Sequence, residues 1–350
     1  MELDEREWKE FFIYEIFPDI KRGKRLKKED HIIGIFPYVS SSAINNGVDG
    51  FVGNIDGVRR YKKCLSLANS GSVGSCFYEP FEFVASDHIT HLEGDYTKSQ
   101  YLFMASMLNR LSGKYNFNRE INDERISREK IVLPVDVNGN PDFDFMEKYI
   151  QNILKFKLEK YLKYCRYKLV KLGEIITLQS FSEVIWKPFR INKIAQVDSG
   201  RDIYDAERIS GDLPYITAGV QQNGIGYFVG NMNNTIAKKT ISVSRNGAGV
   251  GSSFYHEYFA LYSNDCRKVI LNNYNENKYV SLFITNQIMT QRNNYNYSRK
   301  MGTERLKKQM IMLPALNDDE PDYEYMEQYI KNLMIKKYTS YITYIENSFQ

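Results

Sequence analysis

Residues 115–153 read YNFNREINDERISREKIVLPVDVNGNPDFDFMEKYIQNI, and residues 295–333 read YNYSRKMGTERLKKQMIMLPALNDDEPDYEYMEQYIKNL. The two segments align without a gap, and 15 of their 39 positions are identical. Unrelated segments of this length would share only a few positions, so the chain contains an internal repeat. The rest of the sequence must fit the architecture that this repeat sets.

Two further blocks recur in the same order. Residues 37–54 read PYVSSSAINNGVDGFVGN and residues 214–231 read PYITAGVQQNGIGYFVGN, with eight of 18 positions identical. A looser pair is LANSGSVGSCFY, ending at Tyr78, and SRNGAGVGSSFY, ending at Tyr255. All three blocks recur at nearly the same offset, which is half the chain and several times longer than the periods of solenoid repeats. We therefore predict two copies of one domain.

The composition is typical of a globular protein, and the 350 residues are enough for two domains. The hydrophobic content of 43% and the nine prolines exclude wholesale disorder and a collagen fold. The four cysteines form no CxxC pair, so neither a zinc site nor a disulfide framework is expected. The acidic start and the lack of a long apolar run predict no signal peptide, no membrane span and a cytoplasmic location.

Charge and aromatic content are compatible with nucleic-acid binding. The 47 basic and 43 acidic residues leave a net charge of +4, which is too weak a field for a histone-like binder. Phosphate contacts would therefore be local, as in the basic stretch KRGKRLKK at Lys21–Lys28. The 27 tyrosines suit interfaces that are both apolar and hydrogen-bonding, although an AT-rich genome would explain them equally well.

Each copy is predicted to begin with short strands and to close with a helix, which gives an α/β (α+β) fold of two tandem domains. Asn46-Gly47 and Asn223-Gly224 lie between apolar runs and are strong hairpin signals. Pro141-Asp142 and Pro321-Asp322 are helix start signals. We expect domains at residues 1–141 and 169–321, and long helices at residues 142–168 and 322–350. The second copy is expected to carry some twenty additional residues between about Lys171 and Pro214.

Apolar residues recur at spacings of three and four along both predicted helices, which places each set on one stripe. A stripe of this kind can pack on its own domain. However, the helices would be about 39 Å long at 1.5 Å per residue, which is long for a domain of this size. We therefore expect the two helices to pack on each other as an antiparallel coiled coil with approximate two-fold symmetry. The residues expected in this packing are Met146, Ile150, Ile153, Leu158, Met326, Ile330, Leu333 and Tyr338.

Catalytic motifs are largely missing. The segment Gly247–Gly251 looks like a nucleotide or S-adenosylmethionine loop, but the residues after it suit a strand instead of the helix that such a loop needs, which favours a glycine turn. The sequence has no GKS or GKT phosphate loop, no Asn/Asp-Pro-Pro-aromatic motif of amino-methyltransferases, and no E-x-K triplet after either Pro-Asp pair. The four histidines lack repeated partners, so we predict neither catalytic residues nor metal ligands.

Polar, basic and aromatic residues recur in both copies. Lys and Arg bind phosphates, Asn and Gln pair with adenine, and Arg pairs with guanine. Each residue taken alone is explained by ordinary turn chemistry, but the repeated set favours nucleic acid. The candidates in the first copy are Lys21, Arg22, Lys24, Arg25, Ser40, Ser41, Asn45, Asn46, Asn69, Lys114, Tyr115, Asn116 and Arg119. Those in the second are Thr217, Gln221, Gln222, Asn223, Arg245, Asn246, Arg292, Asn294, Tyr295, Arg299 and Lys300.

The repeated blocks resemble those of the DNA-specificity (S) subunits of restriction-modification systems, over nearly the whole chain. The first copy, with Phe17, Gly23 and residues 37–51, looks like the short subunits of type IIB, BcgI-like systems. The second copy, with Leu172-Gly173-Glu174-Ile175, looks like the type I form. Many type I relatives have longer or paired helices, whereas each spacer here is predicted as one helix of about seven turns.

The resemblance implies a non-catalytic protein whose two target-recognition domains each read one half of a bipartite double-stranded DNA sequence. Two DNA methyltransferase (M) subunits would dock on the spacer helices and bring S-adenosylmethionine, and an endonuclease or translocase subunit would complete the complex with its magnesium. The chain itself would need no cofactor. Two other functions remain open on the sequence: a duplicated protein- or glycan-binding module, and a stand-alone methyltransferase or nuclease that uses the glycine loop.

Overall fold

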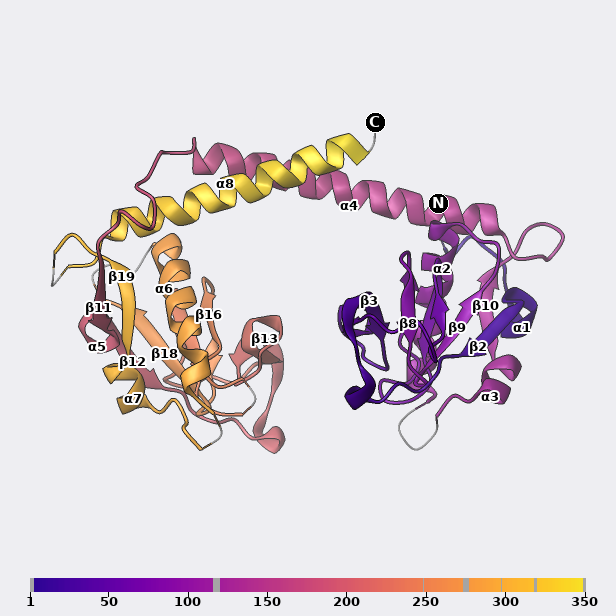
Figure 1. Ribbon diagram of the computed structural model, residues 1–350, viewed down its shortest axis with the longest axis horizontal. Coiled ribbons are helices and arrows are strands. Elements are labelled where there is room, and N and C mark those ends of the chain that lie inside the picture. The colour runs from indigo at the N-terminus through magenta and orange to yellow at the C-terminus, as the bar shows by residue number, and fades with distance from the viewer. Residues whose placement is uncertain are drawn as a thin grey trace. The chain divides into compact units, whose positions relative to one another are not determined.

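The structure is a computed structural model that describes residues 3–115, 120–247, 249–272, 277–296, 298–317 and 320–348. The chain divides into two compact units, Met1–Tyr161 and Leu162–Gln350, and each unit contains one copy of the repeat. Strands and helices are mixed in both units, as expected (Figure 1). Among the described residues, none of the helices combines the length and the apolar composition that a membrane span requires.

The first unit is built on two four-stranded sheets, with strand orders β2-β9-β6-β7 and β4-β3-β8-β5. A separate pair joins β1 to β10. The elements in chain order are β1 (Trp8–Phe12), α1 (Ile13–Ile16), β2 (Asp19–Arg22), η1 (Lys28–Asp30), β3 (Ile33–Val39), η2 (Asn45–Gly47), β4 (Val48–Val52), β5 (Arg60–Tyr61), β6 (Cys64–Ala68), β7 (Cys76–Glu79), β8 (Phe83–Ala85), β9 (Ile89–Glu93), α2 (Lys98–Leu108), η3 (Asn109–Gly113), α3 (Asp123–Arg128), β10 (Lys130–Pro134) and α4 (Phe143–Leu172).

The second unit repeats this topology. Its four-stranded sheet has the order β12-β18-β15-β16, which matches β2-β9-β6-β7 strand for strand, and its three-stranded sheet has the order β14-β13-β17. The elements are β11 (Trp186–Arg190), α5 (Ile191–Ile194), β12 (Ala195–Ser199), η4 (Asp205–Glu207), β13 (Ser210–Ile216), η5 (Gln222–Gly224), β14 (Ile225–Val229), β15 (Thr240–Ser244), β16 (Ser253–His256), β17 (Leu261–Tyr262), β18 (Cys266–Leu271), α6 (Lys278–Thr290), η6 (Gln291–Asn294), α7 (Thr303–Lys308), β19 (Met310–Pro314) and α8 (Tyr323–Ser348).

The two tryptophans of the chain mark equivalent positions in the two units. Trp8 stacks on Phe103 of α2, with ring centroids 6.2 Å apart. Trp186 stacks on Phe283 of α6, with ring centroids 6.3 Å apart. Each tryptophan begins the strand that pairs antiparallel with the last strand of its unit, β1 with β10 and β11 with β19. The second copy therefore begins at Trp186.

This start corrects one prediction from the sequence. The stretch of chain from Trp8 to Pro37 is almost exactly as long as that from Trp186 to Pro214, so the second copy has no additional segment before Pro214. Residues 173–185, which the sequence suggests as the start of the second copy, instead connect α4 to β11. They lie beside α8, where Asn332 bonds both backbone groups of Ile176 at 2.7 and 3.1 Å.

We call the sheets β2-β9-β6-β7 and β12-β18-β15-β16 the main sheets of the two units. A buried helix covers one face of the main sheet in each unit. In the first unit, Tyr101 and Met104 of α2 are almost completely buried with Leu65 and Leu92 of the sheet. In the second unit, Phe283 and other residues of α6 occupy the equivalent core. Each fully buried side chain of this size contributes about 1.5–3 kcal/mol, so these two helices carry much of the stability of their units.

The predicted start signals of the long helices are confirmed. Oδ1 of Asp142 accepts a hydrogen bond from the backbone N–H of Phe145 at 2.9 Å, and Asp322 caps α8 through Tyr325 at the same distance. The helix α4 extends to Leu172, beyond the predicted end at residue 168. It stops at Gly173, whose φ of +79° is the left-handed conformation that ends many helices.

The apolar stripes of the long helices divide between two roles. Met146 and Met326 are fully buried in the cores of their own units, and Ile150 and Ile330 pack partly against the same cores. The first turns of each helix therefore belong to their own domain, which is the less favoured arrangement on the sequence alone. Farther along the helices the stripe is more open: Ile153 and Leu158 are half-buried, Tyr338 is half-buried, and Leu333 is exposed.

Within the second unit, the last turns of α4 pack antiparallel on α8. Tyr164 contacts Tyr338 edge-on, with ring centroids 6.2 Å apart. Arg166 forms an ion pair with Glu346 near the end of α8 at 2.8 Å, whereas Ile176, just after α4, bonds to Asn332 in the first half of α8, so the chain here runs antiparallel to α8. Cys165 is completely buried at this contact. The predicted antiparallel packing is thus observed for the part of α4 that belongs to this unit.

Candidate nucleic-acid interface

Each unit carries a hairpin turn of three consecutive residues in the left-handed conformation. The φ angles are +51°, +52° and +76° for Asn45–Gly47, and +48°, +54° and +76° for Gln222–Gly224. The turns close through Ser40, whose N–H donates to Gly47 at 2.9 Å, and Thr217, whose N–H donates to Gly224 at 2.7 Å. The left-handed conformation costs a residue other than glycine about 1–2 kcal/mol. These strained turns hold their amide side chains exposed to solvent.

A second loop packs against the hairpin in both units. In the first unit, a Cβ on Gly71 would lie 2.5 Å from Oγ of Ser41, so only glycine fits there. In the second unit, a Cβ on Gly249 would lie 2.6 Å from the carbonyl oxygen of Ala218, so the corresponding loops also approach closely, through a neighbouring position. The glycine-rich loops therefore allow close approach between two backbones.

The segment after the buried helix joins the same loops. The N–H of Ile121 donates to the carbonyl of Asn69 at 2.9 Å, and the N–H of Met301 donates to that of Arg245 at 3.1 Å. We call the three joined segments of the first unit, residues 40–47, 69–75 and 109–121, the first loop cluster. The second loop cluster is residues 217–224, 245–252 and 291–302. Asn116, Arg119 and Ala248 fall within these ranges but lie outside the described residues.

The basic segment of the first unit is attached to the first loop cluster through Arg22. Its Nε donates to the carbonyl oxygen of Asp87 at 2.5 Å, and the same oxygen accepts a hydrogen bond from Nδ2 of Asn69 at 3.3 Å. Lys24 and Arg25 follow with exposed side chains. Lys21 is also exposed, and its ammonium lies 3.0 Å from Asp19 on the same strand.

Three predicted DNA-contacting residues are instead buried: Asn69 is 2% exposed, Tyr115 4% and Tyr295 8%. The hydroxyl of Tyr115 donates to the carboxylate of Glu129, and the hydroxyl of Tyr295 donates to the side-chain oxygen of Gln309. Burial raises the pKa of Tyr295, so its hydroxyl stays protonated as a donor. These side chains support the loop clusters from within, and we assign them a structural role.

The other described candidates lie at the surface or near it. Lys114 is paired with Glu129 at 2.8 Å, and the guanidinium of Arg299 lies 5.7 Å from the ring centroid of Tyr295. Exposed side chains are those of Lys21, Lys24, Arg25, Asn45, Asn46, Lys114, Gln221, Gln222, Asn223, Arg292, Asn294 and Arg299. Half-buried ones are those of Arg22, Ser40, Ser41, Thr217, Arg245, Asn246 and Lys300.

Two arginines beside the second hairpin, Arg201 and Arg208, are not among the residues predicted from the sequence. Arg201 is the counterpart of Lys24, since its N–H donates to Tyr262 at 2.8 Å as that of Lys24 donates to Ala85 at 3.0 Å. The guanidinium of Arg208 lies 3.7 Å from the ring centroid of Tyr227, over an exposed face. The constant offset between the copies, applied to Lys24, would have identified Arg201.

Arg208, Tyr227 and Thr217 line one hollow of about 680 Å³ beside the second hairpin turn. Its wall also includes Tyr215, whose hydroxyl accepts a hydrogen bond from the N–H of Ile203 at 3.0 Å. Burial raises the pKa of Tyr215, so this hydroxyl is protonated at neutral pH. The hollow therefore combines the Arg208 cation, an aromatic face and hydroxyl groups with three carboxylates, those of Asp202, Asp205 and Asp265, and Asp205 pairs with Arg208. Its chemistry is mixed and does not by itself favour a phosphate.

The glycine loop Gly247–Gly251 joins β15 to β16, which pair antiparallel. Gly247 and Gly251 have φ of +73° and +78°, which are turn conformations. A nucleotide loop would instead lead from a strand into a helix, with the helix N-terminus facing the phosphates. The interpretation of this motif as a turn is confirmed.

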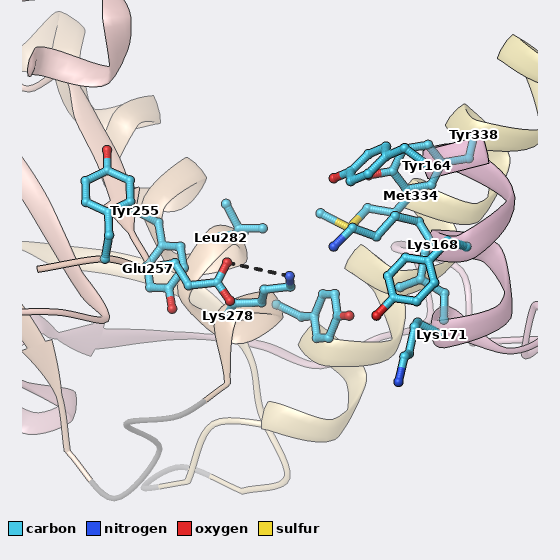
Figure 2. A pocket seen from close by; sticks show the side chains of 13 residues that line it. Tyr164, Lys168, Lys171, Tyr255, Glu257, Lys278, Leu282, Met334 and Tyr338 are labelled. Atoms are coloured by element: carbon cyan, nitrogen blue, oxygen red, sulfur yellow. Dashed lines mark ion pairs between the residues drawn. The ribbon is translucent and has the colours of Figure 1, made fainter. Parts of the chain in front are cut away.

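The second unit also has a groove of about 560 Å³ between the last turns of α4 and the middle of α8 on one side and α6 and β16 on the other (Figure 2). It is lined mainly by tyrosines and lysines, and on the α6 side Lys278 forms an ion pair with Glu257 at 3.7 Å. On α4, Tyr167, which lines the groove, is 56% exposed, and Val170 is 83% exposed. The surface of the helices thus offers apolar contact area beside positive charge.

Comparisons with known proteins agree with this arrangement. The family model "Type I restriction modification DNA specificity domain" matches residues 5–164 and again residues 183–342. The chain is 30% identical over 330 residues to the specificity subunit S.BcgI of a type II restriction enzyme from Heyndrickxia coagulans, covering 92% of this chain and 93% of that protein. A similar fold is that of the S subunit of a type I restriction-modification system from M. genitalium, with a TM-score of 0.50 at 16% identity, covering 99% of this chain and 96% of that one. The chain belongs to the DNA-specificity subunits of restriction-modification systems.

Proposed function

We propose that each loop cluster reads one half of a bipartite double-stranded DNA target and that the chain performs no catalytic step. The observation that carries this proposal is a common frame with different exposed side chains. The same strained turn presents Asn45 and Asn46 in the first unit, but Gln222 and Asn223 in the second. Equal frames with different hydrogen-bonding groups are what two different half-sites require.

The exposed amides have the chemistry for base reading. An Asn or Gln side chain pairs with N6 and N7 of adenine in the major groove, and one such pair discriminates by about 1–3 kcal/mol. Positively charged neighbours supply phosphate contacts, which fix the register without reading sequence. In the first unit these are Lys24 and Arg25, and in the second Arg201 occupies the place of Lys24.

The long helices are proposed to dock the catalytic partners. We infer two methyltransferase subunits, which bring S-adenosylmethionine, and an endonuclease or translocase subunit that brings magnesium. Support comes from the exposed apolar residues on the helices: Phe156 is 66% and Tyr344 67% exposed. Large exposed apolar side chains on a helix are typical of an interface that a partner covers. The glycine turn at Gly247–Gly251 is unsuited to S-adenosylmethionine, which favours a cofactor site in the partner.

The direct test is to map methylated sites in the DNA of cells that express the chain with its methyltransferase. The proposal expects a motif of two short blocks separated by unspecified bases. Exchange of residues 1–140 for those of a relative should then change one block and leave the other intact. A continuous motif, or a change in both blocks after the exchange, would contradict the division of labour between the two units.

A further inference from the structure

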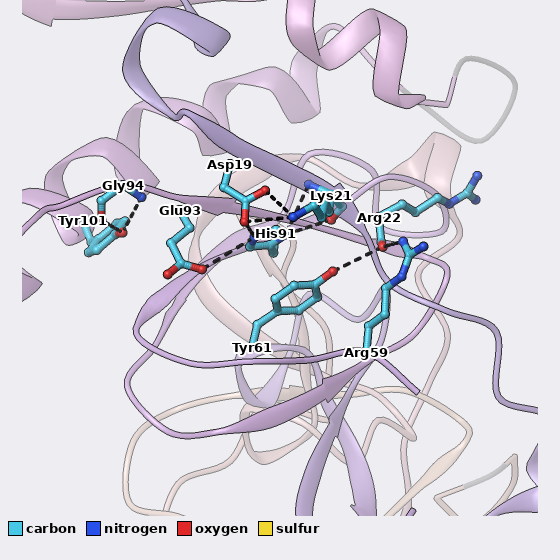
Figure 3. Close-up of polar contacts among 9 residues, drawn as sticks. All are labelled: Asp19, Lys21, Arg22, Arg59, Tyr61, His91, Glu93, Gly94 and Tyr101. Carbon is cyan, nitrogen blue, oxygen red and sulfur yellow. Dashed lines mark hydrogen bonds and ion pairs between the residues drawn. The ribbon is translucent and has the colours of Figure 1, made fainter. Parts of the chain in front are cut away.

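Three potential ligands meet on one face of the main sheet in the first unit. Asp19 lies on β2, and His91 and Glu93 lie two residues apart on β9, so both β9 side chains point to the same face. Asp19 is directly opposite Glu93 in the strand pairing. One ligand atom from each of the three residues lies within 4.8 Å of the others (Figure 3).

The imidazole of His91 is fixed and completely buried. Its Nδ1 lies 3.0 Å from the carbonyl oxygen of Lys21 and 3.2 Å from the N–H of the same residue. Tyr61 stacks on the ring at 3.8 Å between centroids. The nitrogen Nε2 points into the acidic cluster, at ion-pair distances of 3.3 Å from Asp19 and 3.6 Å from Glu93, and neither contact has hydrogen-bond geometry.

This arrangement has the features of a metal-binding histidine. When Nδ1–H donates to the carbonyl of Lys21, which is the shorter of the two contacts, Nε2 carries a lone pair that faces two carboxylates. Histidines that ligate metals generally donate their second ring N–H to a carbonyl or carboxylate in this way. A bound cation would lie between this lone pair and the two carboxylates, and would be attracted by all three.

The second unit places a cation of its own at the same position. In the pairing of β12 with β18, Gln196 and Lys268 stand where Asp19 and His91 stand in the first unit. The side chain of Lys268 is largely buried, and its ammonium lies 3.8 Å from the carboxylate of Asp198. The second unit thus has a lysine ammonium at this position, whereas the first unit has potential ligands for a cation there.

We propose that Asp19, His91 and Glu93 bind a divalent transition-metal cation, with Zn²⁺ as the best chemical match. One imidazole nitrogen and two carboxylate oxygens form a mixed donor set that suits zinc, whereas calcium and magnesium prefer oxygen alone. The carboxylate side chains of Asp19 and Glu93 are 44% and 46% exposed, so the ion can enter from solvent and retain water as further ligands.

The site would fasten β2 to its neighbour β9. The strand β2 lies at the edge of its sheet and ends at Arg22, where the basic segment begins. The ion would also compete with Lys21 for Asp19, and the Lys21 side chain is 61% exposed and can turn into solvent. Binding should therefore stabilise the first unit whether or not DNA is present, which separates this inference from the proposed function.

The test uses the full chain, stripped with EDTA and titrated with ZnCl₂ in competition with a chromophoric chelator. We expect one zinc ion per chain and a higher melting temperature of the first unit. D19N and E93Q should each weaken zinc binding at least about tenfold, because each removes one of three protein ligands. H91Q should abolish it, and H88Q is the matched control because His88 lies in the same unit with its side chain half exposed.

Two results would overturn the inference. One is the absence of stoichiometric zinc binding by the wild-type chain. The other is unchanged binding by the D19N/E93Q double variant, which would place the ion elsewhere. If H91Q fails to fold, D19N and E93Q still decide, since both side chains are half exposed. The four cysteine thiols are buried and should not compete in the folded chain.

Discussion

The buried carboxylate of Glu79 accepts a hydrogen bond from Oγ of Ser66 at 2.8 Å. The second unit has His256 and Ser242 in the same places, with Nε2 of the ring 2.8 Å from the hydroxyl oxygen. Burial raises the pKa of Glu79 to about 7 and lowers the pKa of His256 to about 4. The two copies thus keep a buried titratable group at one position, which is an acid in the first unit and a base in the second.

Glu79→Gln should stabilise the first unit above neutral pH. Folded Glu79 holds its proton up to about pH 7, whereas an unfolded glutamate releases it near its ordinary value of 4.5. Stability from this group is therefore present below about pH 4.5 and is lost as pH rises through 7. The pKa shift of Glu79 corresponds to a difference in unfolding free energy of roughly 3 kcal/mol at most. The glutamine variant cannot ionise, so it should retain this stability at pH 8.

The measurement is urea unfolding at several pH values in a Trp186→Phe background, so that Trp8 alone reports on the first unit. Glu29→Gln is the control, because its carboxylate is 74% exposed. Parallel pH profiles for wild type and Glu79→Gln between pH 4.5 and 8 would contradict the buried acid.

His256→Gln should remove an acid sensitivity from the second unit. Folded His256 stays neutral down to about pH 4, whereas the unfolded residue takes up a proton near 6.5. Its contribution is present above about pH 6.5 and is lost as pH falls through 4, the reverse of Glu79. Trp186 fluorescence in a Trp8→Phe background should show a smaller loss of stability between pH 7 and 4.5 in the variant than in the parent. An equal loss would mean that the histidine is not the sensor, and His88→Gln serves as the control.

The strained turn of the second unit should lower the stability of that unit while it presents an amide side chain to DNA. Gln222→Gly should raise the free energy of unfolding by about 1 kcal/mol, since glycine adopts a φ of +48° without strain. It should also weaken binding to the cognate DNA about tenfold through loss of the amide. Gln222→Ala should lose affinity without the gain in stability. If both variants bind normally in a DNA titration, Gln222 does not read a base.

Arg201→Ala should weaken DNA binding about equally for cognate and unrelated sequences. A phosphate contact contributes affinity without specificity, and its loss should reduce the slope of log affinity against log salt by about one. Binding titrations at four salt concentrations would measure both effects. Arg128→Ala is the control, because that side chain is 76% exposed and pairs with Glu124 at 2.7 Å. A loss confined to the cognate sequence would instead make Arg201 a base reader.

Local chemistry made several features predictable from the sequence. The Asn-Gly turns and the Pro-Asp helix starts depend on residues adjacent in sequence, and both are found where expected. The buried helix α2 is not evident from the sequence, because Tyr101 and Met104 belong to a helix that is apolar on most sides and lacks a clear stripe. The end of α4 is placed too early because Gly173 resembles part of the next domain.

Long-range pairing explains the other misses. Asp19 and His91 are far apart in the sequence, and only the register of β2 against β9 brings them together. The sequence does not indicate that the side chain of Asn69 points inward and donates hydrogen bonds to Asp87 and Thr90. The second copy starts at Trp186, but its first strand is too short and too diverged for the match with Trp8 to be evident.

The account depends most on the independence of the two reading surfaces. The most direct measurement is the methylated motif in cells that express the Asn45→Ala/Asn46→Ala variant or the Gln222→Ala/Asn223→Ala variant together with the methyltransferase. We expect each pair of substitutions to relax one block of the motif and to leave the other block unchanged. Relaxation of both blocks by either variant, or an unchanged motif in both, would contradict the account.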